Sequence, residues 1–249
     1  MKKLLLAFLT SALILTAAGC GEEKKEETKN DGSDKVSQSI NFGGEDTTDE
    51  AVAYLKTVVP YFSKYLETRM EYPLTYEAEI TTAEGTQFAG IYIRDESSMV
   101  ISAVNLFGSE SKTIYTADKM YSVDGVEKII YSGDYKEENS KRVVSANLLK
   151  IDVEQAKSCD YTSGEKTYNG VNYKHESISM GGATVDYYFD MNTGDLKYVV
   201  SDGSETKVLV LENKVKESAF DLPEGYKEAT LEEYYEKIQK ELDAQQSNQ

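Results

Sequence analysis

Residues 187–197 read Tyr-Tyr-Phe-Asp-Met-Asn-Thr-Gly-Asp-Leu-Lys, an aromatic run followed by a polar turn and a return to apolar residues. Aromatic side chains favour strands, because they pack well on a pleated surface. The Asn-Thr-Gly segment supplies, at Gly194, the positive φ that a tight hairpin requires. This stretch therefore predicts a strand, a hairpin turn and a second strand.

Similar turn signals recur on both sides of this hairpin. Short segments rich in Thr, Ile, Val and Tyr fill residues 74–131 and 172–211. The turn signals between them are Glu84-Gly85, Asp95-Glu96, Gly108-Ser109, Ala117-Asp118, Asp124-Gly125, Gly181-Gly182 and Asp202-Gly203. Strands at this short, regular spacing are typical of an antiparallel meander.

The strands carry apolar residues on both faces. Val185, Tyr187 and Phe189 alternate onto one face, whereas Tyr188 adds an aromatic ring to the other. A sheet with one face in water shows a cleaner alternation of apolar and polar residues. We therefore expect the second face to be covered by helices or by a ligand.

Three helical segments accompany these strands. The capping box Thr47–Glu50 precedes apolar residues at helical spacing as far as Leu66, and Pro60 is expected to kink or divide this helix. Residues 143–156 predict a mid-chain helix, and a second capping box, from Thr230 to Glu233, starts a C-terminal amphipathic helix. These elements predict the α+β class.

The terminal segment Phe220-Asp221-Leu222-Pro223-Glu224-Gly225-Tyr226-Lys227, together with the hairpin and the element order, resembles the LolA/LolB-like superfamily of bacterial envelope proteins over residues 47–228. The resemblance implies an antiparallel, incompletely closed β half-barrel with N-terminal, mid-chain and C-terminal helices. It also implies an apolar cavity, lidded by helices, that accepts acyl chains. The lipoprotein carriers of this superfamily use a functional arginine, which the resemblance does not assign to Arg69 or Arg94.

The N-terminus predicts export. Lys2 and Lys3 precede an apolar run too short for a confident membrane span, which is typical of a signal peptide over residues 1–19. The following Thr16-Ala17-Ala18-Gly19-Cys20 resembles a lipobox, with Ala17 where Leu is favoured. This implies a diacylglycerol on the Cys20 thiol and acyl chains, palmitate among them, as a membrane anchor. The alternative is an ordinary secretory signal cleaved near Ala18, which leaves Cys20 as a thiol.

The chain then divides by composition. Residues 20–46 are mostly charged or small and are expected to form a lipidated, disordered tether. Residues 47–229 form the predicted half-barrel domain, and residues 230–249 the C-terminal helix and tail. The preference for Lys over Arg indicates a low-GC Gram-positive bacterium, which places the lipid-anchored protein on the extracytoplasmic face of the cell membrane.

The acidic composition excludes some partners. The chain has 44 Asp plus Glu against 27 Lys plus Arg, a net charge of −17. Removal of residues 1–19 takes away two lysines and no acid, which lowers this charge to −19. Nucleic acid and the anionic lipid headgroups of a membrane surface are therefore disfavoured as partners. The only membrane attachment expected is the lipid on Cys20.

Residues that carry catalytic chemistry are few. His175, the one histidine, lies in a strand-like segment where a solvated or core-edge side chain is expected, and no serine is selected to act with it. Residues Asp190–Asp195 partly resemble a calcium loop, but Ser201 occupies the position of the distal glutamate, and a hairpin explains the turn. Cys159 is expected to be a small buried residue. We predict no enzyme activity, no metal and no cofactor.

Two functions follow from these observations. The first is a membrane-anchored module that binds a lipid or other apolar ligand in a half-barrel cavity. The side chains proposed to line it are Tyr92, Ile101, Tyr121, Tyr187 and Phe189. The alternative is an envelope sensor or interaction protein that binds no small molecule and uses its acidic surface or its C-terminal helix to meet a basic protein.

Overall fold

The computed structural model of the chain describes residues 49–246. The predicted signal peptide, Cys20, the tether and the first two residues of the N-terminal capping box lie outside the described residues. Within residues 49–246, no helix combines the length and the apolar character that a membrane crossing requires.

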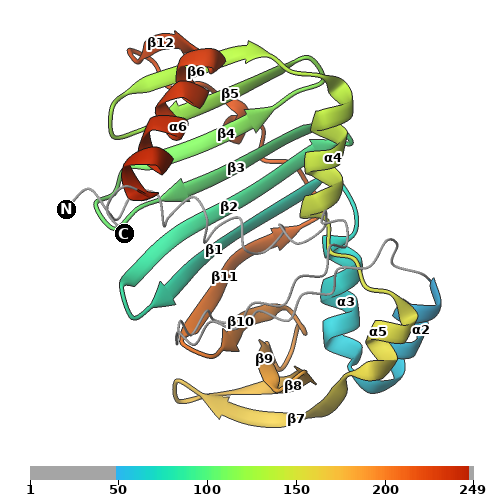
Figure 1. Cartoon of the computed structure of the whole chain (residues 1–249). Helices are drawn as coiled ribbons and strands as arrows, with labels where there is room; N and C mark the ends of the chain where they lie inside the picture. The colour runs from blue at the N-terminus through green and yellow to red at the C-terminus, as the bar shows by residue number, and fades with distance from the viewer. Residues whose placement is uncertain (1–48, 247–249) are drawn as a thin grey trace. The chain divides into compact units, whose positions relative to one another are not determined.

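The chain forms two compact units, and the boundary between them falls within one helix and one strand. In the described part, unit 1 comprises residues 49–67 and 149–207, and unit 2 comprises residues 68–148 and 208–246. The elements that lie in unit 1 or begin there are α2 (Asp49–Val58), α3 (Pro60–Arg69), α5 (Val153–Ser158), β7 (Asp160–Tyr168), β8 (Val171–Met180), β9 (Ala183–Phe189), β10 (Leu196–Ser201) and β11 (Ser204–Glu212) (Figure 1).

Unit 2 holds the longer run of antiparallel strands. Its elements are β1 (Leu74–Thr82), β2 (Gly85–Asp95), β3 (Ser98–Val104), β4 (Glu110–Tyr115), β5 (Lys119–Asp124), β6 (Ile129–Asp134), α4 (Glu137–Asn147), the short 3₁₀ helix η1 (Glu217–Phe220), β12 (Lys227–Thr230) and α6 (Leu231–Gln246). The ends of α3 and β11 also belong to this unit.

The strands follow one hydrogen-bonded order, β12-β6-β5-β4-β3-β2-β1-β11-β10-β9-β8-β7. From β1 to β6 and from β7 to β11, strands consecutive in the chain pair antiparallel, whereas β12 runs parallel to its neighbour β6. Among the described strands the two ends of this order, β12 and β7, have no pairing with each other, so the sheet is open. The α+β class and the incompletely closed antiparallel arrangement are therefore confirmed in the connectivity.

The hairpin predicted over residues 187–197 forms in the structure. Strands β9 and β10 are joined by a turn in which Gly194 has a φ of +69°, and the backbone N–H groups of Asn192 and Thr193 donate to the Asp190 carboxylate. Asp190 N–H also donates to the Asp195 carbonyl. The two aspartates of the turn thus accept hydrogen bonds from the backbone of the turn itself, Asp190 through its carboxylate and Asp195 through its carbonyl.

Pro60 divides the first helix in two, one of the two outcomes expected. Proline suits the first position of a helix, because its missing N–H has no partner there. The next two N–H groups of α3, at Tyr61 and Phe62, donate to the two carboxylate oxygens of Glu176 at 3.1 and 2.6 Å. Glu176 lies on β8 and is fully buried. A residue more than a hundred positions away therefore caps α3.

The mid-chain helix has different bounds from those expected. Instead of one helix over residues 143–156, α4 ends at Asn147 and α5 begins at Val153. Asp152 adopts an extended backbone, and its carboxylate accepts a hydrogen bond from Gln155 N–H at 2.6 Å. Aspartate favours such a capping position over a helix interior, because its side chain competes for backbone donors. Ile151, just before it, is fully buried.

The sequence pattern does not predict strands β7 and β12. Strand β7 is exposed along nearly its whole length and has a polar, charged sequence, which suits the edge of a sheet but gives no apolar alternation. Strand β12 has only four residues and pairs in parallel with β6. Neither has a periodic pattern that a sequence reader recognises.

Replacement of Glu176 by alanine should destabilise the protein by about 3 kcal/mol, because two buried backbone N–H groups lose their acceptors. Urea unfolding measures this change. Burial raises the pKa of Glu176, and the two hydrogen bonds offset only part of that effect. Glu176→Gln, which keeps one acceptor, should lose less.

The matched control is Glu165→Ala on the exposed strand β7, where the ion pair with Lys174 lies at the surface. Its effect should stay within about 0.5 kcal/mol. A loss of under about 1 kcal/mol in Glu176→Ala would show that α3 does not depend on this cap.

Candidate functional site

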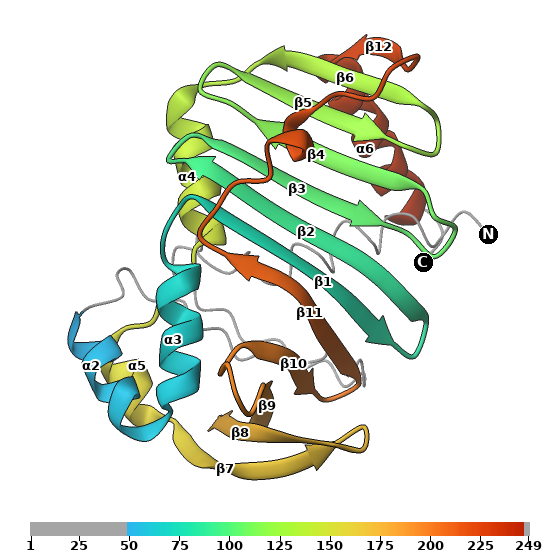
Figure 2. The ribbon, with the colours of Figure 1, turned by 180° about the vertical axis from the view of Figure 1, so that it is seen from behind.

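One face of the unit 2 sheet is packed by α4 and α6, as Figure 1 shows. On β3 the side chains of Met99, Ile101 and Ala103 alternate onto this face, because Met99 pairs with Tyr115, which pairs with Met120 beneath α6. We call this surface the α4/α6 face. Figure 2, seen from behind, shows the η1 segment on the opposite face.

A row of short side chains crosses the α4/α6 face. Ala78 pairs with Ala89, Ala89 with Ala103, and Ala103 with Ser111, so one row runs in register over strands β1 to β4. Ala89, Ala103 and Ser111 are partly exposed. We call these four residues the small-residue row.

A row of larger side chains lies next to the small-residue row on the same face. Its members, in register from β1 to β4, are Tyr76, Ile91, Ile101 and Thr113. Tyr76 and Ile91 are buried, whereas Ile101 and Thr113 are partly exposed. The centre of the α4/α6 face is therefore apolar, short-chained and incompletely buried.

Helix α6 is fixed at one end of this face. The predicted capping box forms in full, since Glu233 N–H donates to Thr230 Oγ1 and Thr230 N–H donates to the Glu233 carboxylate. Leu231 packs with Met120 and Tyr131 on the sheet. The helix is thus held by its first turn and by its apolar side.

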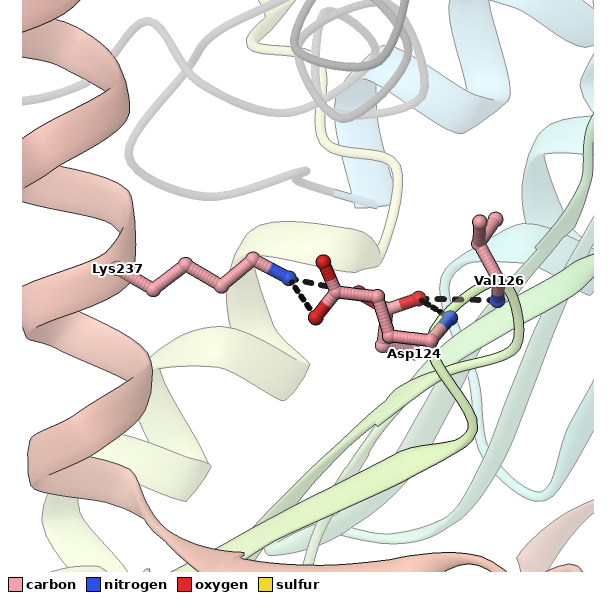
Figure 3. Close-up of polar contacts among 4 residues, drawn as sticks. Asp124, Val126 and Lys237 are labelled. Atoms are coloured by element: carbon pink, nitrogen blue, oxygen red, sulfur yellow. Dashed lines mark hydrogen bonds and ion pairs between the residues drawn. The ribbon is translucent and has the colours of Figure 1, made fainter.

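A charged contact adds a second attachment of α6 (Figure 3). Lys237 Nζ donates to Asp124 Oδ2 at 2.9 Å and to Glu127 Oε2 at 2.8 Å. Asp124 Oδ1 accepts from the backbone N–H groups of Val126 and Glu127. Burial alone raises the pKa of Asp124, but the hydrogen bonds from Glu127, Lys237 and Val126 together outweigh it and lower that pKa. Asp124 therefore holds both the β5–β6 turn and the helix.

The opposite face of the same sheet is covered by the chain itself. Ala219 and Phe220 pack on an apolar cluster formed by Tyr92, Val100, Ile114 and Tyr121. Lys112 Nζ donates to the carbonyls of Ala219 and Asp221, and Arg94 pairs with Glu217 while lying 3.9 Å from the Phe220 ring centre. We call this surface the η1 face.

The Tyr92 hydroxyl has a hydrogen-bond partner within unit 2. Its hydroxyl donates to Glu77 Oε1 at 2.9 Å, and Lys216 Nζ donates to the same oxygen at 2.6 Å. Burial and the hydrogen bond to Glu77 raise the pKa of Tyr92 well above its usual value. Tyr92 is therefore a neutral, partnered core residue.

Two further predicted ligand residues lie in the core of unit 1. Tyr187 packs on Phe62 of α3, with ring centres 4.8 Å apart, and Phe189 packs on Tyr61 at 5.5 Å. Both are buried. Of the five residues proposed to line a cavity, Tyr92 and Tyr121 share the η1 face, Tyr187 and Phe189 lie under α3, and Ile101 alone lies on the α4/α6 face.

The other face of the unit 1 sheet carries a tyrosine cluster. The rings of Tyr168 and Tyr188 stack with centres 4.4 Å apart, and Tyr173 and Tyr198 pack edge-on against this pair. The aromatic side chains on the second face of this sheet therefore pack against one another, from one strand to the next. The sequence had predicted that helices or a ligand would cover this face.

His175 lies beside this cluster and is engaged. Its Nε2 is 2.6 Å from Asp186 Oδ1, and its ring centre is 5.1 Å from that of Tyr188. Lys166 Nζ lies 3.5 Å from the other oxygen of the Asp186 carboxylate. The side chain is mostly buried, as a core-edge histidine should be.

Arg69 is the last residue of α3, and its sequence context predicts no role for it. Its side chain is 3% exposed, and its guanidinium carbon lies 4.5 Å from the ring centre of Tyr76. Nη2 donates to the Asn147 carbonyl over a long 3.4 Å. Within residues 49–246, Nε and Nη1 are buried and have no hydrogen-bond partner. Only the folded structure reveals this, because sequence does not show which arginine is buried.

Two other kinds of candidate site, a metal site and a reactive cysteine, find no support among the described residues. Among the described residues no group of three His, Cys, Asp or Glu side chains is arranged to hold a metal ion. Cys159 is buried, its Sγ lies 3.4 Å from the Gln155 carbonyl, and burial raises the pKa of its thiol. A raised pKa disfavours the reactive thiolate.

No protein-family model matches this sequence, and no curated protein sequence matches it. Among solved structures, the chain is similar to an uncharacterized conserved protein from Thermus thermophilus, with 11% identity and a TM-score of 0.39, over 68% of this chain and 99% of that one.

The chain is also similar to two structures of MucB. One has 11% identity and a TM-score of 0.42, over 70% of this chain and 65% of MucB. The other, from the Pseudomonas aeruginosa MucA/MucB complex, has 13% identity and a TM-score of 0.40, over 70% and 62%. The chain therefore spans less than two thirds of these MucB chains. Similarities at this level assign it no ligand or partner, and membership of the LolA/LolB-like superfamily stays a prediction.

Asp124→Asn should lower the free energy of unfolding by about 1.5 kcal/mol at pH 7, because it removes the charge that pairs with Lys237. The pKa of Asp124 is lowered in the folded protein, so this contribution is present above the usual aspartate pKa and is lost as the pH falls through the lowered value. Urea unfolding of both proteins from pH 7 to pH 3 should show the difference shrinking toward zero.

Glu236→Gln is the control on the same helix, since its pair with Lys240 is exposed. It should change stability by less than about 0.5 kcal/mol at every pH. A difference between Asp124→Asn and the parent protein that stays constant with pH would contradict the assigned role of Asp124.

Proposed function

We propose that this chain is an extracytoplasmic lipoprotein, anchored through acyl chains on Cys20, that binds a lipid or similar apolar ligand on the α4/α6 face. The observation that carries the proposal is the small-residue row with its partly exposed neighbours Ile101 and Thr113. Apolar side chains in the middle of a sheet are normally covered, and incomplete cover over such a row is typical of a ligand-binding surface.

The small-residue row gives a ligand room to lie across the strands. Alanine and serine side chains end at or just beyond Cβ, whereas the neighbouring row carries larger residues such as Tyr76 and Ile91. An acyl chain placed there gains about 0.8 kcal/mol for each methylene removed from water. Helices α4 and α6 pack on the same face and give such a chain further apolar surface.

The other apolar faces are less suited to a ligand than the α4/α6 face, because side chains of the same chain already cover them. The η1 face is filled by Ala219 and Phe220 of the same chain. The face of the unit 1 sheet that holds Tyr187 and Phe189 is filled by α3. Of the residues proposed to line a cavity, we retain Ile101 as a contact of the ligand and treat the other four as core residues.

We further propose that the protein binds without catalysing a reaction. His175 is paired with Asp186, and the described hydrogen bonds of the nearby Ser177 hydroxyl join it to Thr162. A serine nucleophile is activated by a histidine that takes its proton. This arrangement offers the histidine a carboxylate and leaves the hydroxyl to a neighbouring threonine.

A second candidate function, an envelope interaction protein, is favoured by two exposed apolar side chains. Phe107 is 85% exposed in the β3–β4 turn, and Val126 is 47% exposed in the β5–β6 turn. In an antiparallel meander these two turns lie at the same end of the sheet. A protein partner that docks there would be unaffected by changes to the small-residue row.

A form that lacks residues 1–20 should copurify with extractable lipid in native mass spectrometry and take up a fluorescent fatty acid. Ala103→Phe places a ring over the small-residue row and should weaken uptake by about tenfold. Tyr121→Phe on the η1 face is the control and should leave uptake unchanged. Protein that is empty and takes up no fatty acid would rule out the proposed function.

His175→Ala should leave both ligand uptake and the hydrolysis of ester substrates at the level of the parent protein, since no step depends on its proton. Turnover of p-nitrophenyl esters measures this. An esterase activity that is present in the parent protein and absent in His175→Ala would show an enzyme in place of a binding protein.

A further inference from the structure

Arg69 is a buried cation without a counter-charge in the part of the chain that the structure describes. No carboxylate of residues 49–246 pairs with it, and two of its three guanidinium nitrogens have no hydrogen-bond partner. The contacts that remain are the Tyr76 ring and one long hydrogen bond to Asn147. Buried charges in proteins are normally paired, because an unpaired one is costly to take out of water.

The other described arginines differ from Arg69 in having a counter-charge or in being exposed, although Arg94 Nε is also buried without a hydrogen-bond partner. Arg94 forms an ion pair with Glu217 and is partly exposed, and Arg142 is exposed on α4. The arginine guanidinium carries hydrogen-bond donors and no acceptor, so a buried nitrogen of Arg69 is satisfied only by an acceptor. Its two free nitrogens therefore point to a missing acceptor.

Arg69 lies beside the α4/α6 face. The guanidinium covers the ring of Tyr76, which stands in register with Ile91 and Ile101 on the next two strands. Adjacent strands are about 4.8 Å apart, so Ile101 lies about 10 Å from Tyr76 along this row. A cation at the β1 end of an apolar row matches the layout of a molecule with a charged head and an apolar chain.

We propose that Arg69 binds the anionic oxygen group, a carboxylate or a phosphate, of the ligand whose chain lies on the α4/α6 face. The inference rests on the proposed function and adds the chemistry of the head group. An oxyanion against either edge of the guanidinium accepts from Nη2 and from one of the two free nitrogens, the two-point geometry that arginine offers to carboxylates and phosphates. Tyr76 holds the plane of the guanidinium, and Asn147 holds Nη2.

The test compares charged and neutral probes that share one tail. Membranes from cells that express the full chain are labelled with a photoreactive sixteen-carbon fatty acid or with the fatty alcohol of the same tail, and crosslinks to residues 85–104 are counted by mass spectrometry. The parent protein should prefer the acid by about tenfold, as expected for a charge-assisted hydrogen bond. Arg69→Gln should abolish this preference and keep labelling by the alcohol.

Two further variants make the result specific. Arg142→Gln removes the same charge from an exposed site of unit 2 and should keep the preference. Arg69→Lys keeps the charge without the planar fork and should retain only part of it. Labelling by the alcohol reports that a variant is folded, because the tail contacts do not involve the guanidinium.

Competitors identify the source of the anion. A sixteen-carbon alkyl phosphate that displaces the labelled acid at equal or lower concentration assigns a phosphate head, and displacement by palmitic acid alone assigns a carboxylate. Displacement by inorganic phosphate at low concentration would indicate a free anion with no tail and would overturn the inference. An equal preference for the acid in Arg69→Gln and the parent protein also overturns it but leaves the proposed function intact, whereas failure of every probe to label the parent protein overturns both.

Discussion

The packing of unit 1 depends on the Glu176 carboxylate, which accepts the backbone hydrogen bonds that the start of a new helix at Pro60 leaves without helical acceptors. The proline starts α3 and breaks the helical run after Val58, which leaves the N–H groups of Tyr61 and Phe62 without helical acceptors. The buried carboxylate on β8 accepts both. Because the cap comes from the sheet, it fixes the start of α3 over β9, where Tyr187 and Phe189 find their aromatic partners. Local chain chemistry and tertiary packing are thus joined at one side chain.

In unit 2, side-chain donors play the corresponding part. Lys112 donates to two carbonyls of the η1 segment, and Asn213 donates to the Thr68 carbonyl at the end of α3. Lys237 joins α6 to the β5–β6 turn. Side chains from strands and helices therefore satisfy backbone and carboxylate groups of segments that have no regular partner, as buried polar groups require. Within residues 49–246, Arg69 is the residue with two buried side-chain nitrogens that have no hydrogen-bond partner, whereas Arg94 has one.

The sequence alone predicted the features that depend on residues close together in the chain. The hairpin at Gly194, the turns of the meander and the capping box at Thr230 each depend on neighbouring residues, and all formed as expected. Where the pattern was weak the prediction was wrong or silent, as for the exposed strand β7 and for the break at Asp152 inside the expected mid-chain helix. Aspartate favours a capping position, but only the extended backbone of Asp152 shows that it takes one here.

The sequence by itself determined the class of the fold, the antiparallel meander and the positions of most turns, because these follow from periodicity and local turn chemistry. The open form of the sheet was implied only by the resemblance to the LolA/LolB-like superfamily. The sequence did not determine the site. Tyr92, Ile101 and Tyr187 look equally apolar in the sequence, yet the structure puts them on the η1 face, on the α4/α6 face and under α3. Only the register between neighbouring strands aligned the small-residue row, and only the burial of Arg69 exposed its lack of a partner. The register is set by pairing between strands, and the burial of Arg69 involves contacts with residues as far along the chain as Asn147; the pattern within one segment encodes neither.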